Sequence, residues 1–349
     1  LMDTPEALAL ASPPEGSMAI AIRDDSHWHS MRANDVTASV AAALLGLHPK
    51  LTALGLYNIK TGIDSDPVNV EPVRSGGEGW WSISYPPAAR GHLLEPFAMA
   101  ECQRLTGWQM SYPLQHYWTS TRDSLGATPD AFAIAENLPG FGITQFKTVA
   151  PDVFDKQWVD PTTGDIVPPD WVLVQATQEA FLTGASWAAI AVIRLTYSLE
   201  VSVVLMPRSP ALWHKLRKGA TEFWAMVAAG TPPAIDWERD QRNVLSLYSD
   251  SDGTEVDLSD DDELAGILAE RARLKAIEDA GNAAAKDRRS YDARIIAKLR
   301  NAATARAPGG ALIKAPTTYR QPYSVAATSF RTVRVTGLRS LATDIPERF

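Results

Sequence analysis

Three residues in the middle of the chain have types and a spacing that suit phosphodiester chemistry. Asp130 follows Thr128-Pro129, and Gln145 and Lys147 come after an interval of fourteen residues. Residues two apart in a strand point to the same face, so Gln145 and Lys147 should lie side by side, with Asp130 converging from the preceding strand. Oxygen ligands suit Mg²⁺ or Mn²⁺, which would activate water and stabilise the attacking and leaving oxygens. Lys147 would steady the attacking water or the charge on phosphorus.

The elements that must position these residues are indicated by the hydrophobic pattern. Strands are expected over residues 125–135 and 141–148, and an amphipathic helix over residues 90–105. The order predicts an α/β or α+β domain with a mixed sheet. The other expected elements are a helix-loop-helix region over 24–62 with a helix starting at Thr37, loops over 63–86 and 149–170, strands over 114–119, 188–195 and 200–206, and helices over 169–183 and 209–229.

Composition excludes several classes of protein. The chain has 349 residues, of which 45% are hydrophobic and 21% charged, as in ordinary globular proteins. A single cysteine, Cys102, excludes an internal disulfide and a cysteine-based zinc site. The net charge of −8 argues against a protein that coats nucleic acid through bulk positive charge, but it is compatible with a local basic channel. The sequence contains no apolar run of about 18 residues, so no membrane span is expected.

The sequence changes character after Pro232-Pro233. Residues 250–263 hold eight acidic residues and no Lys or Arg, which is typical of a solvated surface. A long helix is expected over residues 261–303, interrupted near Gly281. Its apolar residues are expected to face inward: Leu264, Leu268, Leu274, Ile277, Ile295, Ile296 and Leu299. Residues 303–349 form a basic tail with a net charge of +5.

Several segments resemble one nuclease family when they are taken in order. They are Trp28 to Arg32, Leu56 to Gly62, Gly91 to Glu95, Thr128 to Asp130, Gln145 to Lys147, Val174-Gln175 and Leu182 to Gly184. Together they resemble the PD-(D/E)xK nucleases and, among them, the YqaJ viral recombinase family of phage alkaline exonucleases, which is related to lambda exonuclease. The resemblance implies a restriction-endonuclease-like core, in which helices flank a mixed central sheet, and a helical C-terminal extension.

The resemblance also implies roles for particular residues. Asp130, Gln145, Glu95 and the carbonyl of Phe146 would hold the metal, and Lys147 would be the catalytic lysine. The 5′-phosphate of the cut strand and the DNA backbone would be bound by Arg32, Ser39, Thr128 and Gln175. Trp28 is interpreted as a core residue, and the histidines as lying outside any metal site.

Gln145 departs from the family pattern, which has Glu at this position. An amide oxygen can bind a metal but brings no charge, so Mg²⁺ binding should weaken. Three interpretations remain open. Gln145 is an engineered inactivating substitution, or a natural variant that keeps partial or full activity, or the carboxylate has moved to Glu179, which lies one helical turn after Gln175.

The implied activity is a metal-dependent exonuclease that degrades one strand of duplex DNA from its 5′ end. It would leave 3′ single-stranded tails for a single-strand annealing protein. The resemblance further implies a ring-shaped homotrimer around DNA, encoded by a phage or prophage and located in the bacterial cytoplasm. Two alternatives are a weak or inactive member that binds DNA ends, and an endonuclease built on the same core.

Three regions are expected from these patterns. Residues 1–23, rich in Ala and Pro near the start, form a flexible N-terminus. Residues 24–235 form the nuclease domain. Residues 236–349 form a C-terminal extension that contains the acidic segment, the long helix and the basic tail.

Overall fold

The computed structural model describes residues 13–65, 72–77, 79–113, 116–250, 254–306, 308 and 312–317. The chain divides into two compact units, Leu1–Leu247 and Tyr248–Phe349. The first twelve residues of the expected flexible N-terminus lie outside the described part, as does most of the basic tail from residue 318 onward. The predicted limits of the nuclease domain and of the extension stay predictions.

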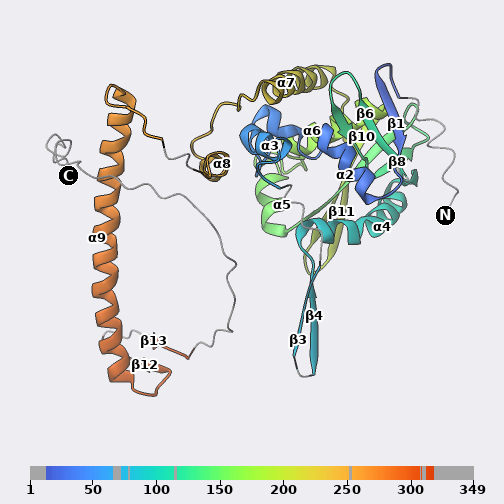
Figure 1. Cartoon of the computed structure of the whole chain (residues 1–349). Coiled ribbons are helices and arrows are strands. Elements are labelled where there is room, and N and C mark those ends of the chain that lie inside the picture. Colours follow the sequence, from blue (N-terminus) through green and yellow to red (C-terminus); the bar gives the residue numbers. More distant parts are fainter. Residues whose placement is uncertain are drawn as a thin grey trace. The chain divides into compact units, whose positions relative to one another are not determined.

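The first unit is a mixed α/β structure (Figure 1). It contains most of the predicted helices and strands, together with elements that the sequence pattern did not indicate. The elements are β1 (Ser17–Ala21), α2 (Asp25–Asn34), β2 (Val36–Thr37), η1 (Ala41–Leu45), α3 (Ala53–Lys60), β3 (Val73–Gly77), β4 (Trp80–Ser84), α4 (Pro87–Thr106), β5 (Gln109–Ser111), β6 (His116–Ser120), β7 (Leu125–Ala127), β8 (Ala131–Ile134), β9 (Gly142–Val149), α5 (Pro151–Gln157), α6 (Asp170–Thr183), β10 (Trp187–Leu195), β11 (Leu199–Met206), α7 (Pro210–Ala229) and α8 (Gln241–Leu247).

Two sheets organise this unit. The larger sheet has five strands in the order β11-β10-β9-β8-β5, and it is mixed because β9 runs parallel to β10 and antiparallel to β8. The smaller sheet has the order β1-β6-β7-β2. In the larger sheet Ala131 pairs with Thr144, and this register brings Asp130 beside the start of the Gln145 to Lys147 segment.

Helices cover both faces of the five-stranded sheet. On one face Ala98 and Cys102 of α4 pack against Phe146. On the other face Phe154 of α5 and Val172 of α6 pack against Ile190 and Val192 of β10. Side chains alternate along a strand, so the neighbours of Phe146 point toward α6. Gln145 and Lys147 therefore share the face that α6 covers, as their spacing predicts.

Four local expectations were wrong. The strand expected over 125–135 is two strands, β7 in the smaller sheet and β8 in the larger one, and Asp130 stands between them. The helix expected from Thr37 is a short strand followed by the 3-10 helix η1, because Val36 and Thr37 pair with β7. The loop expected over 63–86 contains the antiparallel hairpin of β3 and β4, which extends away from the sheets in Figure 1. The loop expected over 149–170 contains α5, whose first residue, Pro151, suits a helix start because its missing N–H needs no partner there.

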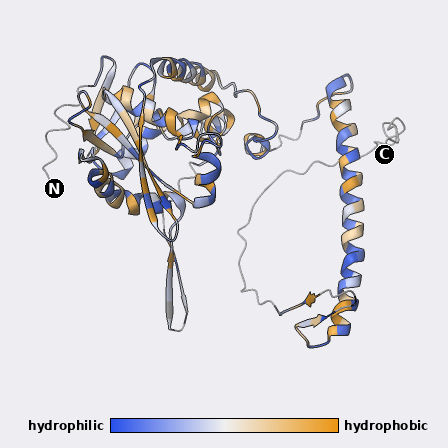
Figure 2. Ribbon diagram, turned by 180° about the vertical axis from the view of Figure 1, so that it is seen from behind, coloured by the Kyte–Doolittle hydropathy of each residue, from blue (hydrophilic) through white to orange (hydrophobic). Residues whose placement is uncertain are grey.

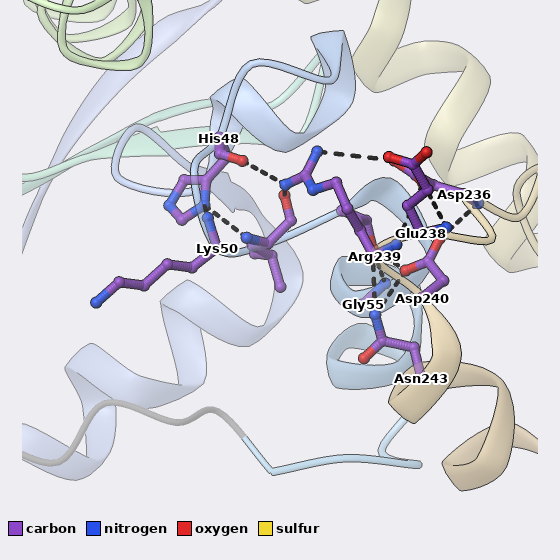
Figure 3. Close-up of polar contacts among 10 residues, drawn as sticks. His48, Lys50, Gly55, Asp236, Glu238, Arg239, Asp240 and Asn243 are labelled. Carbon is purple, nitrogen blue, oxygen red and sulfur yellow. Dashed lines mark hydrogen bonds and ion pairs between the residues drawn. The ribbon is translucent and has the colours of Figure 1, made fainter. Parts of the chain in front are cut away.

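A buried polar cluster fastens residues 236–247 to α3 (Figure 3). Asp240 is fully buried and accepts hydrogen bonds from the Thr52 hydroxyl, from Asn243 Nδ2 at 2.6 Å and from the Asp236 backbone N–H at 2.9 Å. Asn58 donates from Nδ2 to the backbone carbonyl of Asn243 at 2.9 Å. Residues beyond Pro233 thus form part of the first compact unit, up to Leu247.

The second unit is dominated by α9 (Asp262–Leu299), which begins at the capping carboxylate of Asp261. The helix continues through Gly281, so the expected interruption was wrong. The expected inward face was also wrong for most of its members, because Leu274, Ile277, Ile295 and Ile296 are exposed. Hydrophilic and hydrophobic residues alternate along α9 in Figure 2. The short strands β12 (Thr304–Arg306) and β13 (Leu312–Lys314) pair beyond the helix.

Among the described residues, no helix is both long enough and apolar enough to cross a membrane.

Candidate active site

A cavity of about 520 Å³ opens where α2, α4 and α6 approach the ends of the central strands. Six of the nine residues that the sequence singled out line it: Arg32, Ser39, Glu95, Thr128, Asp130 and Gln175. The other three, Gln145, Phe146 and Lys147, lie on β9 and contact members of this set through hydrogen bonds. The fold therefore brings all nine predicted residues into one neighbourhood, although none of their roles follows from position alone.

Asp130 stands at the entry to β8 and is held by the neighbouring strand. The backbone N–H of Phe146 donates to Asp130 Oδ2 at 2.7 Å. Burial raises the pKa of Asp130 to about 6, and the charge of Glu95 adds to this rise, whereas Lys147 opposes it. Burial thus disfavours the negative charge of Asp130, and a bound cation or a proton would compensate this charge.

Glu95 lines the cavity from α4, the helix that covers the face of the sheet opposite to α6. Its Oε1 lies 2.9 Å from Nδ1 of His92, one turn earlier in the same helix. His92 also lines the cavity, and the expectation that the histidines lie outside any metal site stays a prediction. His92 is a neighbour of an acidic residue here, and no second histidine lines the cavity with it.

Gln145, Lys147 and Gln175 form one hydrogen-bonded network behind the cavity. Lys147 Nζ donates to Gln145 Oε1 at 3.0 Å and to Gln175 Oε1 at 2.9 Å. Gln175 Nε2 donates to Gln145 Oε1 at 2.7 Å and to Glu179 Oε1 at 3.1 Å. Lys147 also lies 5.7 Å from the centre of the Trp171 ring. The lysine and both amides are therefore oriented before any ligand binds.

Glu179 is the residue that motif matching alone left out of the site. It lies one turn after Gln175 on α6, is 1% exposed and lines the cavity. Burial raises its pKa well above the usual range, and the charge of Asp130 raises it further, against the effect of Lys147. The signal in the sequence was its helical spacing from Gln175, which suggested a moved carboxylate but could not show burial.

The other end of the cavity carries polar and basic groups from α2 and the segment after it. The Arg32 guanidinium lies 4.3 Å from the centre of the Trp28 ring. Trp28 Nε1 donates to Thr128 Oγ1 at 3.4 Å, and the Ser39 and Thr37 hydroxyls are 3.2 Å apart. Trp28 was expected in the core, but it lines the cavity instead, because α2 lies at the surface with no buried residue.

The residues of this cavity fit a divalent metal ion. Asp130, Glu95 and Glu179 offer hard carboxylate oxygens, the ligands that Mg²⁺ and Mn²⁺ prefer. Glu179 Oε2 is buried and has no hydrogen-bond partner among the described residues. Within the described ranges, no three His, Cys, Asp or Glu side chains are already gathered as a metal site. Like charges repel, so a cation is needed to draw these carboxylates together.

The mixed sheet carries Gln145 and Lys147 on β9, and Asp130 stands at the start of the neighbouring strand β8. Helix α4 supplies Glu95 on one side, and helix α6 supplies Gln175 on the other. This layout is the one that the resemblance to PD-(D/E)xK nucleases led us to expect. Residues 27–186 match the family model of the YqaJ-like viral recombinase domain. This stretch of the chain is therefore similar to a YqaJ-like viral recombinase domain, as the sequence resemblance predicted.

Solved structures similar to this chain include an alkaline exonuclease, LHK-Exo, from Laribacter hongkongensis. It is 17% identical, with a TM-score of 0.42, over 64% of this chain and 99% of that chain. The complex of LHK-Exo with dAMP is 18% identical, with a TM-score of 0.39 over the same shares. No curated protein matches the chain.

Proposed function

We propose that the chain is a metal-dependent exonuclease that degrades one strand of duplex DNA from its 5′ end. The observation that carries this proposal is the set of residues that line the cavity described above. Arg32, Ser39 and Thr128 line the same cavity as Asp130 and Glu95. A phosphate-binding group beside an acidic centre suits a substrate that enters by its phosphorylated end, because an enzyme that cuts within a strand has no need of a terminal phosphate pocket.

The reaction is hydrolysis of the first phosphodiester bond. A water oxygen bonds to phosphorus, the bond from phosphorus to the 3′-oxygen breaks, and that oxygen takes up a proton. A mononucleotide leaves, and a new 5′-phosphate remains on the strand. A divalent cation held by Asp130 and Glu95 would lower the pKa of water and stabilise charge on the oxygens. Lys147 would donate to the developing charge on phosphorus, and Gln175 would keep Lys147 in position.

Several finer features belong to the same proposal. The carbonyl of Phe146 adds an oxygen ligand. The products are 3′ single-stranded tails that a single-strand annealing protein uses in recombination, inside a bacterial cell that carries the phage or prophage. The active form is a homotrimer that encloses DNA. The support for these features is the family domain at residues 27–186, which relates the chain to viral recombinases.

The test is nucleotide release from linear duplex DNA with 5′-phosphates, in Mg²⁺ and then in EDTA. The chain is compared with its Gln145→Glu form. Release by both forms in Mg²⁺, with loss in EDTA and with no cutting of closed circular DNA, is the expected result. Release by the Glu form alone identifies Gln145 as an inactivating substitution.

A second candidate is a DNA-end-binding protein without cleavage. One observation favours it: Gln145 Oε1 already accepts hydrogen bonds from Lys147 and Gln175, so it is poorly placed to bind a metal ion. The same experiment separates the candidates. If neither form releases nucleotides although both bind DNA ends, the exonuclease proposal is wrong. Cuts in closed circular DNA would instead identify an endonuclease.

A further inference from the structure

Gln145 is poorly placed to serve as a metal ligand. Its Oε1 accepts hydrogen bonds from Lys147 Nζ at 3.0 Å and from Gln175 Nε2 at 2.7 Å. Turning the amide over would point its NH₂ group at the Lys147 ammonium, which is unfavourable because both groups are donors. The oxygen therefore stays with these two donors, and the amide nitrogen has no hydrogen-bond partner.

Glu179 has the opposite character. Its Oε1 accepts from Gln175 Nε2 at 3.1 Å, which fixes the orientation of the side chain. Its Oε2 is buried and makes no hydrogen bond of normal geometry among the described residues, although the side chain lines the cavity and the Gln145 side chain lies near enough to lower the pKa of Glu179. An oriented carboxylate oxygen without a donor costs free energy unless something compensates its desolvation. This is the arrangement expected of a ligand that awaits a cation.

We propose that Glu179 supplies the metal-binding carboxylate that a PD-(D/E)xK site normally has at position 145. The inference rests on the proposed function, because it assigns a ligand to the metal of that nuclease. The carboxylate has moved from strand β9 to helix α6, and Gln175 holds both the old and the new position through one NH₂ group. Gln145 then acts as a positioning residue for Lys147 and Gln175.

Charge balance favours a divalent cation at this place. The carboxylates of Asp130, Glu95 and Glu179 line the cavity, and Lys147 lies behind it. Three carboxylates and one ammonium leave two negative charges, which one divalent cation neutralises. With a purely structural Glu179, Lys147 would be the ammonium shared by three carboxylates, and the excess negative charge would stay uncompensated or require a proton. The glutamine at 145 thus changes where the anion sits and leaves the number of anions unchanged.

The test measures Mn²⁺ binding to the full chain by titration calorimetry at pH 8, without DNA. Glu179→Gln keeps the size and the contact to Gln175 but removes the charge. The expected result is an affinity lower by more than about tenfold, similar to the loss in Asp130→Asn. Glu222→Gln is the matched control: it removes one negative charge from an exposed glutamate on α7 that pairs with Lys218. Its affinity should equal that of the unchanged chain.

A rescue variant distinguishes a ligand from a merely structural residue. The double change Gln145→Glu with Glu179→Gln returns the carboxylate to the strand, and it should restore Mn²⁺ binding to within a few-fold. Thermal unfolding in EDTA shows whether each variant is folded. If Asp130→Asn weakens Mn²⁺ binding and Glu179→Gln does not, the ligand role of Glu179 is overturned while the nuclease site stands. If the unchanged chain and Asp130→Asn both fail to bind Mn²⁺, the proposed metal-dependent function itself is wrong.

Discussion

Lys147 holds two amide oxygens at once, Gln145 Oε1 and Gln175 Oε1, and this geometry fixes its ammonium beside the cavity. The pattern of a strand with residues two apart predicted the pairing of Gln145 with Lys147. It did not predict that Gln175, from a helix 28 residues later, would complete the set. A single ammonium held by two neutral oxygens keeps its full charge available for a phosphate.

Replacing Lys147 by Met tests this role. Met keeps the aliphatic stem but removes the charge, so kcat for nucleotide release should fall about 100-fold or more. Binding of Mn²⁺ should not weaken, because the substitution removes no ligand. Rates and calorimetric titrations of the same preparation check both statements. Unchanged kcat would remove Lys147 from the mechanism. Lys156→Met, on α5, serves as the control and should leave kcat unchanged.

Asp35 gives a pH-dependent contribution to stability. It is buried, its Oδ2 accepts from Thr119 Oγ1 at 2.7 Å, and burial raises its pKa above the usual value. The folded protein therefore binds this proton more tightly than the unfolded chain does. The contribution of Asp35 to stability is largest at low pH and declines as the pH rises through its folded-state pKa.

The expected outcome concerns the difference between Asp35→Asn and the unchanged chain. Asn can still accept from Thr119 but does not ionise. The free energy of unfolding of the variant, relative to the unchanged chain, should therefore rise between about pH 4, the usual pKa of an aspartate, and pH 8. Denaturant unfolding at both pH values measures it. A difference that stays constant, or moves the other way, contradicts the assignment.

Strand β9 carries the reactive segment, and its position depends on close contact with β10. Gly142 pairs with Trp187 in this parallel ladder. A Cβ at Gly142 would lie 2.3 Å from the Trp187 ring, closer than any real contact. The glycine is thus needed because the Trp ring occupies the space of a side chain, although its backbone angles are ordinary for a strand.

Gly142→Ala should therefore destabilise the first unit by about 1–3 kcal/mol, because the ring or the strand must shift. Gly219→Ala is the matched control: the same change is made within α7, where the nearest atom is 3.5 Å away. It should stabilise by about 0.5–1 kcal/mol. Chemical denaturation monitored by tryptophan fluorescence compares the two. Equal effects would show that the Trp187 contact does not limit position 142.

At the scale of the whole molecule, every residue that lines the site lies between Trp28 and Glu179, inside the first compact unit. The polar cluster around Asp240 fastens α8 to α3 in the same unit. Helix α9, in the second unit, leaves Leu274, Ile277, Ile295 and Ile296 exposed.

A chain that ends at Leu247 should accordingly unfold cooperatively and bind Mn²⁺ as the full chain does. The comparison uses thermal unfolding and calorimetry of both chains, and sedimentation of both tests whether the proposed homotrimer needs residues 248–349. Ending the chain at Ile235 is the contrasting variant. It removes Asp240 and α8, so the Thr52 hydroxyl loses its buried acceptor, and unfolding should be easier by about 1–3 kcal/mol. If the chain that ends at Leu247 does not bind Mn²⁺, the site depends on residues 248–349 and this prediction is wrong.

The sequence by itself determined the elements with strong periodicity and the order of the site motif. Helices α4, α6 and α7 and strands β9, β10 and β11 follow from spacing that any local segment displays. Asp130, Gln145 and Lys147 could also be identified from local geometry. Residues two apart on β9 share a face, and Asp130 stands at the start of the neighbouring strand β8. The family resemblance then supplied Glu95 and Gln175.

The tertiary structure decided what depends on distant packing. A carboxylate moved to Glu179 was one of the three interpretations of Gln145 that the sequence left open. Its burial and its open oxygen arise because α6 lies against β9, a contact that no local pattern encodes. Trp28 left the predicted core for the cavity because α2 lies at the surface. Three short pieces were missed: strand β2, the hairpin of β3 and β4, and helix α5. Segments this short carry little periodicity of their own, and the strands among them take their structure from the strands with which they pair.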